Sequence, residues 1–379
     1  MLEPAELMAQ ARERAQCTNF GGEDFVEPLQ RYTDSVNRES NFSEIGAATV
    51  REMLIRALTN RLQIEDWYAR HPEIDAEEIV DPVFITGQPR TGSTALGHML
   101  AVDPQTRSLR TWEAAQPCPP PELANATTDP RIAEANRKAK VFEALVPSVR
   151  EALPRDSNGP DECYPLLHLS MANIAMDAWS DMPSFDHWLL ESGFDWDPVY
   201  RYHKRVIKLL QWRHPAKRWV LRAPTHVFGI ESLAAAYPNA RFVMTHRDPV
   251  KTMPSVASLM FNMLDVMLAD ADPVKLGTAM VDKWALGTKR LMAFRERIGD
   301  DRFFDNSHSR QIRDAEGQIA DLYAWLGWDF DDAMRQRIRN WSTENPKGKH
   351  RPKAEFFGMN EDQIRQKFAG YIERFNPCF

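Results

Sequence analysis

The sequence has little cysteine and no long apolar run. Its 379 residues include only Cys17, Cys118, Cys163 and Cys378, which stand far apart and form none of the paired spacings of metal or redox sites. No stretch is apolar for the length that a bilayer crossing needs, and the charged N-terminal segment lacks the apolar core of a signal peptide. We therefore expect a cytoplasmic protein without a metal site and without a transmembrane segment.

An excess of positive charge is also missing. The chain has 47 Lys and Arg against 54 Asp and Glu, so its formal net charge is -7. Such a chain has no general attraction for nucleic acid or for an anionic membrane. Any site for an anion must therefore be a local basic pocket. The length predicts one large domain or two, with ample material for a buried core.

The apolar pattern changes twice along the chain. Residues 1–78 carry apolar positions at three- and four-residue spacing, which predicts a helical N-terminal region packed on the core. Within residues 79–379, short apolar strands alternate with helices, which is typical of a parallel sheet with helices on both faces. An aromatic-rich helical insertion at about 120–215 is expected to cap the ligand-binding edge. The predicted fold is therefore α/β with a P-loop-type parallel sheet. The strand candidates lie in VFITG, TRSLRTW, RWVLRAP, ARFVMTHRDP and DRFFDNS.

The stretch VFITGQPRTGSTALGHML resembles a phosphate-binding loop but lacks its lysine. Nucleotide triphosphatases have Lys where this chain has Ser93, and the only cation inside the loop is Arg90. Loop N–H groups and the following helix N-terminus would still attract phosphate. Phosphoryl transfer also needs Mg²⁺ held by an acid at a strand end, whereas MTHRDP offers basic groups first. An adenylate with a 5′-phosphosulfate fits better; the alternative is a tight turn that only packs a helix on the sheet. The predicted binding residues are Gly87, Pro89, Arg90, Thr91, Gly92, Ser93 and Thr94.

A second anion site is predicted in HRDPVKTMPSVASL. Arg247 stands at a strand end, Asp248 is a suitable N-cap, and Pro249 suits the first position of a helix. Ser255 follows about 9 Å along that helix, so Arg247 and Ser255 could close on one small dianion. The alternative is an ion pair between Arg247 and Asp248 or another surface acid.

Together, PVFITGQPRTGSTAL and RFVMTHRDPVKTMPS resemble the sulfotransferases that use 3′-phosphoadenosine 5′-phosphosulfate (PAPS). The likeness is to the bacterial branch with a Pro-Arg-Thr-Gly-Ser-Thr loop. It spans about residues 81–374 and includes GPDECYPLL, RWVLRAPTH and NPKGKH. It implies that the loop binds the 5′-phosphosulfate and that Arg247 and Ser255 bind the 3′-phosphate. It also implies that a basic turn wraps that phosphate, although a solvated charge cluster would look the same. The turn comprises Lys347, Gly348, Lys349 and His350.

Sulfuryl transfer needs cations and a base. Arg90 and Arg222 are the predicted cations, each beside the C-terminal end of a strand, and related enzymes commonly have Lys at the position of Arg222. His226, just beyond that strand, is the favoured base, in an arrangement similar to that of the cytosolic sulfotransferases. Glu113 is the other candidate, and its position resembles that of the catalytic Glu of protein-tyrosine sulfotransferases. Either residue could instead cap a helix or be a buried hydrogen-bonded group.

The acceptor is predicted to be a hydroxyl of an apolar small molecule or lipid. Asp161 and Glu162 either line its pocket or cap a helix, and His168 is best explained as a packed histidine. The alternatives to a sulfotransferase are a small-molecule P-loop kinase and a catalytically silent nucleotide-binding protein. The sequence leaves the oligomeric state open. The apolar character rests on residues that a plain core would also explain: Met171, Met176, Trp179, Met182, Phe185 and Trp188.

Overall fold

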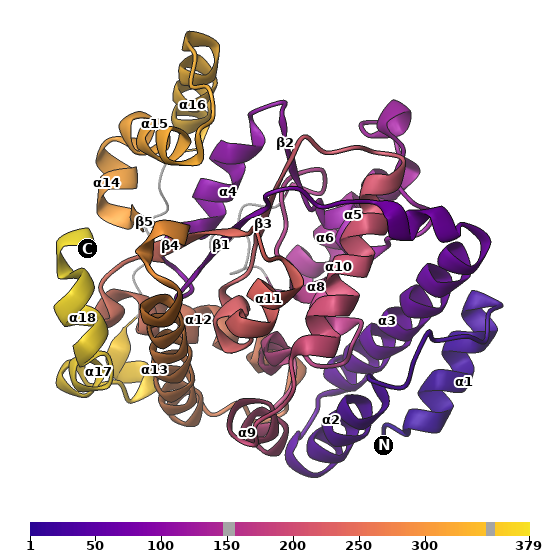
Figure 1. The fold of residues 1–379 in the computed structure, drawn as a ribbon. Helices are drawn as coiled ribbons and strands as arrows, with labels where there is room; N and C mark the ends of the chain where they lie inside the picture. Colours follow the sequence, from indigo (N-terminus) through magenta and orange to yellow (C-terminus); the bar gives the residue numbers. More distant parts are fainter. Residues whose placement is uncertain (147–155, 346–352) are drawn as a thin grey trace.

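The five predicted strands form one parallel sheet, which confirms the α/β prediction. The structure, a computed structural model, describes residues 1–146, 156–345 and 353–379. In the sheet the strand order is β2-β3-β1-β4-β5, and each neighbouring pair is parallel (Figure 1). The strands are β1 (Val83–Gly87), β2 (Thr106–Ser108), β3 (Arg218–Arg222), β4 (Arg241–His246) and β5 (Phe303–Ser307).

Helices surround this sheet, and their bounds follow the chain. The N-terminal part contains α1 (Pro4–Ala15), α2 (Val26–Glu39) and α3 (Glu44–Arg70). The middle part contains α4 (Ser93–Ala101), α5 (Thr111–Ala115), α6 (Pro130–Leu145), α8 (Tyr164–His168), the 3₁₀ helix η3 (Ile174–Ala178), α9 (Pro183–Glu191) and α10 (Asp197–Trp212). After β3 come the 3₁₀ helix η4 (Pro224–Phe228), α11 (Ile230–Ala236), α12 (Pro249–Met267) and α13 (Pro273–Ile298). The C-terminal part contains α14 (His308–Arg313), α15 (Ala315–Leu326), α16 (Asp332–Glu344), α17 (Glu361–Lys367) and α18 (Ala369–Phe375).

Alternate strand residues bury on opposite faces of the sheet, as a strand's two-residue period requires. Phe84 and Phe242 belong to a large apolar cluster that also contains residues of α10, α11, α12 and α13. Val83, Ile85 and Val243 belong to a smaller cluster with residues of α4, α15 and α16. Because both faces are covered, the strands are apolar throughout, and polar side chains gather at the strand ends.

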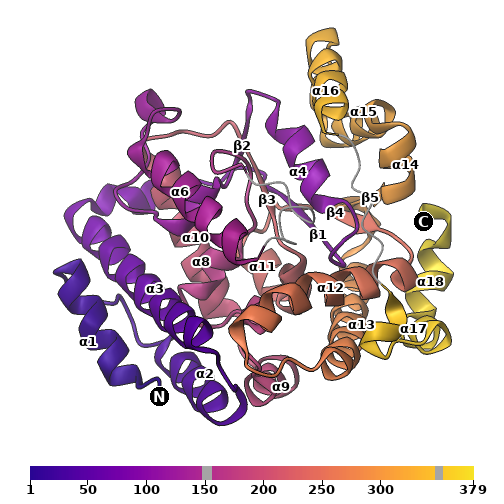
Figure 2. The same ribbon diagram turned by 180° about the vertical axis from the view of Figure 1, so that it is seen from behind.

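The N-terminal helices share the larger core with the sheet. Apolar residues of α1, α2 and α3 belong to the same cluster as Phe84. Helix α3 begins at the N-cap Ser43, whose hydroxyl accepts the Gly46 N–H at 3.0 Å. A β-carbon on Gly46 would lie only 1.9 Å from the Met267 carbonyl oxygen, so α3 packs closely on the end of α12. In both views the N-terminal helices and α17–α18 lie on opposite sides of the sheet (Figures 1 and 2).

The helical insertion differs from the cap expected from the sequence. Residues of α6, α8 and η3 line the cavity described below, as a cap would. Helix α10, however, buries Val206, Leu209 and Leu210 in the larger core together with residues of β1 and β4. Its apolar residues recur at helical spacing, so the helix packs along the sheet.

The described part of the chain contains no helix long and apolar enough to span a bilayer. Within the same residues, no group of three or more His, Cys, Asp or Glu side chains could hold a metal ion. All four cysteines are free thiols.

Candidate active site

A cavity of about 2480 Å³ opens along the carboxyl edge of the sheet. Residues that follow each of the five strands line it, including Pro89, Thr111, Pro224, Arg247 and His308. Helices α3, α6, α8, α12 and α16 also contribute to its walls. The carboxyl edge is where open α/β sheets bind their ligands, so we identify this cavity as the candidate active site.

The loop between β1 and α4 divides into residues that shape it and residues that face the cavity. Gly87 has φ +128°, and a β-carbon there would lie 2.8 Å from the Thr245 carbonyl oxygen of β4. Thr91 is fully buried, and its hydroxyl donates to the Gln88 carbonyl at 2.7 Å. These two residues hold the loop in shape. The predicted residues that line the cavity are Pro89, Arg90, Gly92, Ser93 and Thr94.

The two predicted anion-binding segments meet at Arg90. Its Nε donates to the Ser255 hydroxyl at 3.1 Å, and its carbonyl accepts from the Arg247 guanidinium at 2.9 Å. Arg90 also has φ +64°, a left-handed conformation that a non-glycine residue adopts only when its surroundings hold it there. The structure therefore brings together residues that are 165 positions apart in the sequence.

Positive charge is concentrated where these segments meet. Burial lowers the pKa of Arg90, and the nearby Arg247 lowers it further. Burial also lowers the pKa of Arg247. No carboxylate of the described residues forms an ion pair with Arg247, and Asp248 caps α12 by accepting the Val250 N–H at 3.0 Å. Two mutually repelling, partly desolvated guanidiniums form a place where a dianion would be strongly stabilised.

Arg222, at the end of β3, connects the loop to the opposite wall. One of its guanidinium nitrogens donates to the Thr94 hydroxyl at 3.2 Å and to the Glu162 carboxylate at 2.9 Å. The side chain lies against α4 at Gly97, where a β-carbon would come within 3.0 Å of it. A larger residue than glycine at position 97 would displace this arginine.

Glu162 is held at the cavity by backbone hydrogen bonds on both sides. The Asp161 N–H donates to the Leu109 carbonyl at 2.7 Å, and the Cys163 N–H donates to the Arg222 carbonyl at 2.8 Å. Burial raises the pKa of Glu162, Arg222 opposes that shift, and the like charge of Asp161 adds to it. The result is a cavity-lining carboxyl with a raised pKa beside two arginines, which is the environment of a general base.

His226, the base favoured from the sequence, lies in the core. It is fully buried, its Nδ1 is 3.0 Å from the Tyr200 hydroxyl, and its ring packs edge-on against Phe84. Burial lowers its pKa well below the ordinary value. The preceding residue, Thr225, is the one that lines the cavity. Because η4 turns the side chain of His226 toward the core, the structure does not bring it to Arg90 and Arg222.

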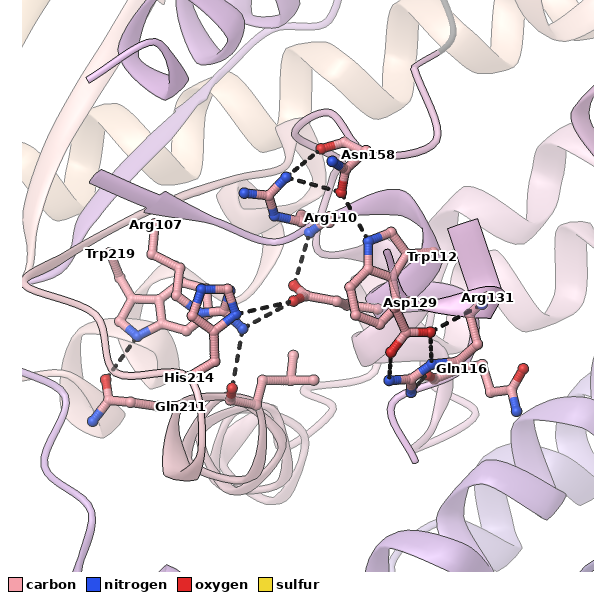
Figure 3. A network of polar contacts seen from close by, with 12 residues as sticks. Arg107, Arg110, Trp112, Gln116, Asp129, Arg131, Asn158, Gln211, His214 and Trp219 are labelled. Atoms are coloured by element: carbon pink, nitrogen blue, oxygen red, sulfur yellow. Dashed lines mark hydrogen bonds and ion pairs between the residues drawn. The ribbon is translucent and has the colours of Figure 1, made fainter. Parts of the chain in front are cut away.

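Glu113, the other candidate base, is also fully buried and takes part in a structural network (Figure 3). Its carboxylate forms an ion pair with Arg107 at 3.0 Å and accepts the Arg110 backbone N–H at 3.2 Å. The second contact caps the N-terminus of α5. His214 donates or accepts at Arg107 over 2.9 Å, and burial lowers its pKa to about 4. The cap and the buried hydrogen-bonded group that the sequence left open are thus both realised at Glu113.

Three cavity residues were missed as site candidates or judged structural from the sequence. Glu162 and His98 both lie near Arg222, and burial lowers the pKa of His98 to about 4. Arg56 lies in the N-terminal helical region, far from both motifs. Only the adjacent acids of the segment DECYPLL gave a sequence signal, and it did not distinguish a cap from a wall. The predicted basic turn, Lys347, Gly348, Lys349 and His350, lies outside the described residues.

The apolar residues of the insertion divide in the same way. Met176 and Trp179 line the cavity, where Met53, Phe142 and Met260 join them. The other four residues named from the sequence pack in the core: Met171, Met182, Phe185 and Trp188. The cavity therefore has an apolar wall, smaller than the sequence suggested and completed by residues from α3, α6 and α12.

Fold and cavity together define an α/β protein with arginines and a helix N-terminus gathered at the carboxyl edge of a parallel sheet. The chain belongs to the sulfotransferase family, whose model matches residues 82–332. It is therefore an enzyme of sulfuryl transfer. The matched residues include β1 to β5 and every cavity-lining arginine described above except Arg56.

Relatives of this chain are mycobacterial sulfotransferases. The chain is similar to the omega-hydroxy-beta-dihydromenaquinone-9 sulfotransferase Stf3 of Mycobacterium bovis and Mycobacterium tuberculosis, at 24% identity over 274 residues. That alignment covers 70% of this chain and 67% of the relative. The crystal structure of sulfotransferase STF9 from Mycobacterium avium matches with a TM-score of 0.88 and 26% identity, over 98% of this chain and 96% of that one. Sulfotransferase STF1 from Mycobacterium tuberculosis H37Rv matches with a TM-score of 0.84 and 28% identity, over 97% and 99%.

Proposed function

We propose that this enzyme transfers the sulfuryl group of PAPS to a hydroxyl of an apolar acceptor. The observation that carries the donor assignment is the contact of Arg90 with Ser255 and Arg247, where two guanidiniums with lowered pKa values face one cavity. Arg247 and Ser255 would hold the 3′-phosphate of the donor. Arg90, the N-terminus of α4 and Thr94 would hold its 5′-phosphosulfate. The absent loop lysine and the lack of a metal-binding group among the described residues fit a donor that needs no Mg²⁺.

We propose Glu162 as the base, in place of His226 and Glu113. Its carboxylate would take the proton of the acceptor hydroxyl while that oxygen forms a bond to sulfur. The bond between sulfur and the 5′-phosphate oxygen would break, and Arg90 and Arg222 would stabilise the negative charge on the sulfuryl and phosphate oxygens. His98 suits the role less, because its lowered pKa moves away from neutral pH whereas the pKa of Glu162 moves toward it.

The apolar wall of Met53, Met176, Trp179 and Met260 supports an apolar acceptor. The lipid named for Stf3 supports the same class. A cavity of about 2480 Å³ has room for a nucleotide and for a sizeable acceptor at once.

The direct test is turnover. Purified enzyme with PAPS and a panel of hydroxylated lipids, sterols and phenols is expected to release 3′-phosphoadenosine 5′-phosphate and to form a sulfate ester without added Mg²⁺. The Arg90→Ala variant is expected to lower kcat/KM by roughly 10²- to 10³-fold, because it removes a donor to developing charge. ATP-dependent phosphorylation of the same panel, with no use of PAPS, would overturn the proposal in favour of a kinase.

A further inference from the structure

One wall of the cavity comes from a helix outside the segment that defines the family. Helix α3 precedes residue 82, where the family match begins. Four of its polar residues line the cavity, and three of these, Glu52, Arg56 and Asn60, recur every four positions on one helix face. Asn60 is held in place by its hydrogen bond to the Ala115 carbonyl at 3.0 Å. Residues of this wall can therefore determine what the particular enzyme binds.

Arg56 carries a charge that its neighbours do not neutralise. The nearby carboxylate, Glu52, is bound by both guanidinium nitrogens of Arg14, at 2.6 and 3.0 Å. Arg56 itself forms no hydrogen bond or ion pair with the residues that the structure describes. Burial lowers its pKa, which means that its charged form is under-solvated. A negatively charged ligand group at this point would restore the missing interaction.

His168 stands beside Arg56 and also lacks partners. Its side chain is 8% exposed and lines the cavity, and neither ring nitrogen has a hydrogen-bond partner among the described residues. Burial lowers its pKa to about 4, and Arg56 contributes to that shift, so the ring is neutral near pH 7. A neutral imidazole retains one N–H donor, and leaving it unpaired in a buried place costs free energy.

We propose that Arg56 and His168 bind a carboxylate of the acceptor, so that the preferred substrate is an apolar hydroxy acid. This inference rests on the proposed sulfotransferase function and deepens it. Arg56 supplies the charge, the His168 N–H supplies a second donor, and the apolar wall of Met53, Met176 and Trp179 accommodates the hydrocarbon part. The hydroxyl of the same molecule is then presented to Glu162.

The experiment compares a hydroxy fatty acid with its own methyl ester, which differ only in the negative charge. Binding of each is measured by calorimetry on the full chain saturated with 3′-phosphoadenosine 5′-phosphate, and turnover with PAPS is measured in parallel. The wild-type enzyme is expected to bind the acid roughly 10- to 100-fold more tightly than the ester, the range for hydrogen bonds to a charged group. Arg56→Met is expected to remove this preference, and Arg56→Lys to keep part of it.

Lys138 provides the matched control, because it is a second cation at the cavity and lies on α6. Lys138→Met is expected to change the acid-to-ester ratio less than about threefold, as for an exposed charge. Equal wild-type affinity for acid and ester would overturn the proposal, as would an unchanged preference in Arg56→Met. Because binding is measured without turnover, an enzyme that fails to use PAPS would contradict the proposed function and still report on the carboxylate site.

Discussion

Replacing Glu162 by glutamine is expected to lower kcat/KM for sulfuryl transfer by roughly 10²- to 10⁴-fold, the usual contribution of a general base. Glutamine keeps the size of the side chain and can still accept a hydrogen bond from Arg222, so donor binding is expected to stay within about threefold of wild type. Steady-state kinetics and calorimetry on the same preparation separate the two effects. A fall in donor affinity equal to the fall in kcat/KM would instead show that Glu162 only positions Arg222.

The pH profile gives this prediction a second readout. The pKa of Glu162 is raised, and the carboxyl accepts a proton only when it is ionised. The wild-type kcat/KM is therefore expected to fall as the pH falls through an apparent pKa above the ordinary value of 4.5. Glu162→Gln should lack this acidic limb. Asp161→Asn should shift the limb to lower pH, because it removes the like charge that raises the pKa of Glu162. A limb that persists unchanged in Glu162→Gln would assign the titration to another group.

Replacing Glu113 by glutamine is expected to cost stability and to leave the chemistry intact. The substitution leaves the buried Arg107 guanidinium without its counter-ion, and breaking a buried pair in this way costs about 3–5 kcal/mol. The measurement is the free energy of unfolding in urea. At a temperature where the variant is folded, its kcat/KM is expected to stay within about threefold of wild type, since Glu113 is fully buried outside the cavity wall.

Glu122→Gln is the matched control for Glu113. Glu122 pairs with Arg213 at 3.0 Å, but both side chains are largely exposed, so its loss should cost less than about 1 kcal/mol. A Glu113→Gln variant that is as stable as Glu122→Gln but has lost activity by 10²-fold or more would make Glu113 the base and contradict the assignment to Glu162.

Most of the fold was predictable because each strand carries its own signal. The segment VFITG is apolar throughout and ends in a glycine, and β1 spans the same residues. The alternation of such strands with helices required a parallel sheet, and the structure has one. The role of α10 was not predictable in this way, because an aromatic-rich helix can cover either a ligand or a sheet with the same pattern.

The anion-suited part of the site was accessible from sequence for a related reason. Arg90 and Arg247 follow neighbouring strands of a parallel sheet, so their side chains must emerge at the same edge. The choice of base was not accessible. His226 and Glu113 stand at plausible distances from the motifs, but one residue of rotation in η4, or a capping position in α5, directs each side chain into the interior. Sequence spacing does not determine that direction.

The wall of α3 could not be predicted from local patterns at all. Arg56 precedes the first motif residue, Gly87, by about a quarter of the matched segment, and only tertiary packing brings it to the cavity. Its charge on an otherwise amphipathic helix resembles any solvated position.

The measurement that tests the donor site most directly is a calorimetric titration with 3′-phosphoadenosine 5′-phosphate, compared with ATP and Mg²⁺. The wild-type enzyme is expected to bind the bisphosphate tightly and ATP weakly. Arg247→Ala is expected to weaken bisphosphate binding by roughly 10²-fold, because it removes a charge-assisted contact to a dianion. Arg297→Ala, which removes an exposed arginine paired with Glu231, should leave binding unchanged. Tight binding of ATP with Mg²⁺ together with indifference to the bisphosphate, or equal affinities in the wild type and Arg247→Ala, would contradict the account.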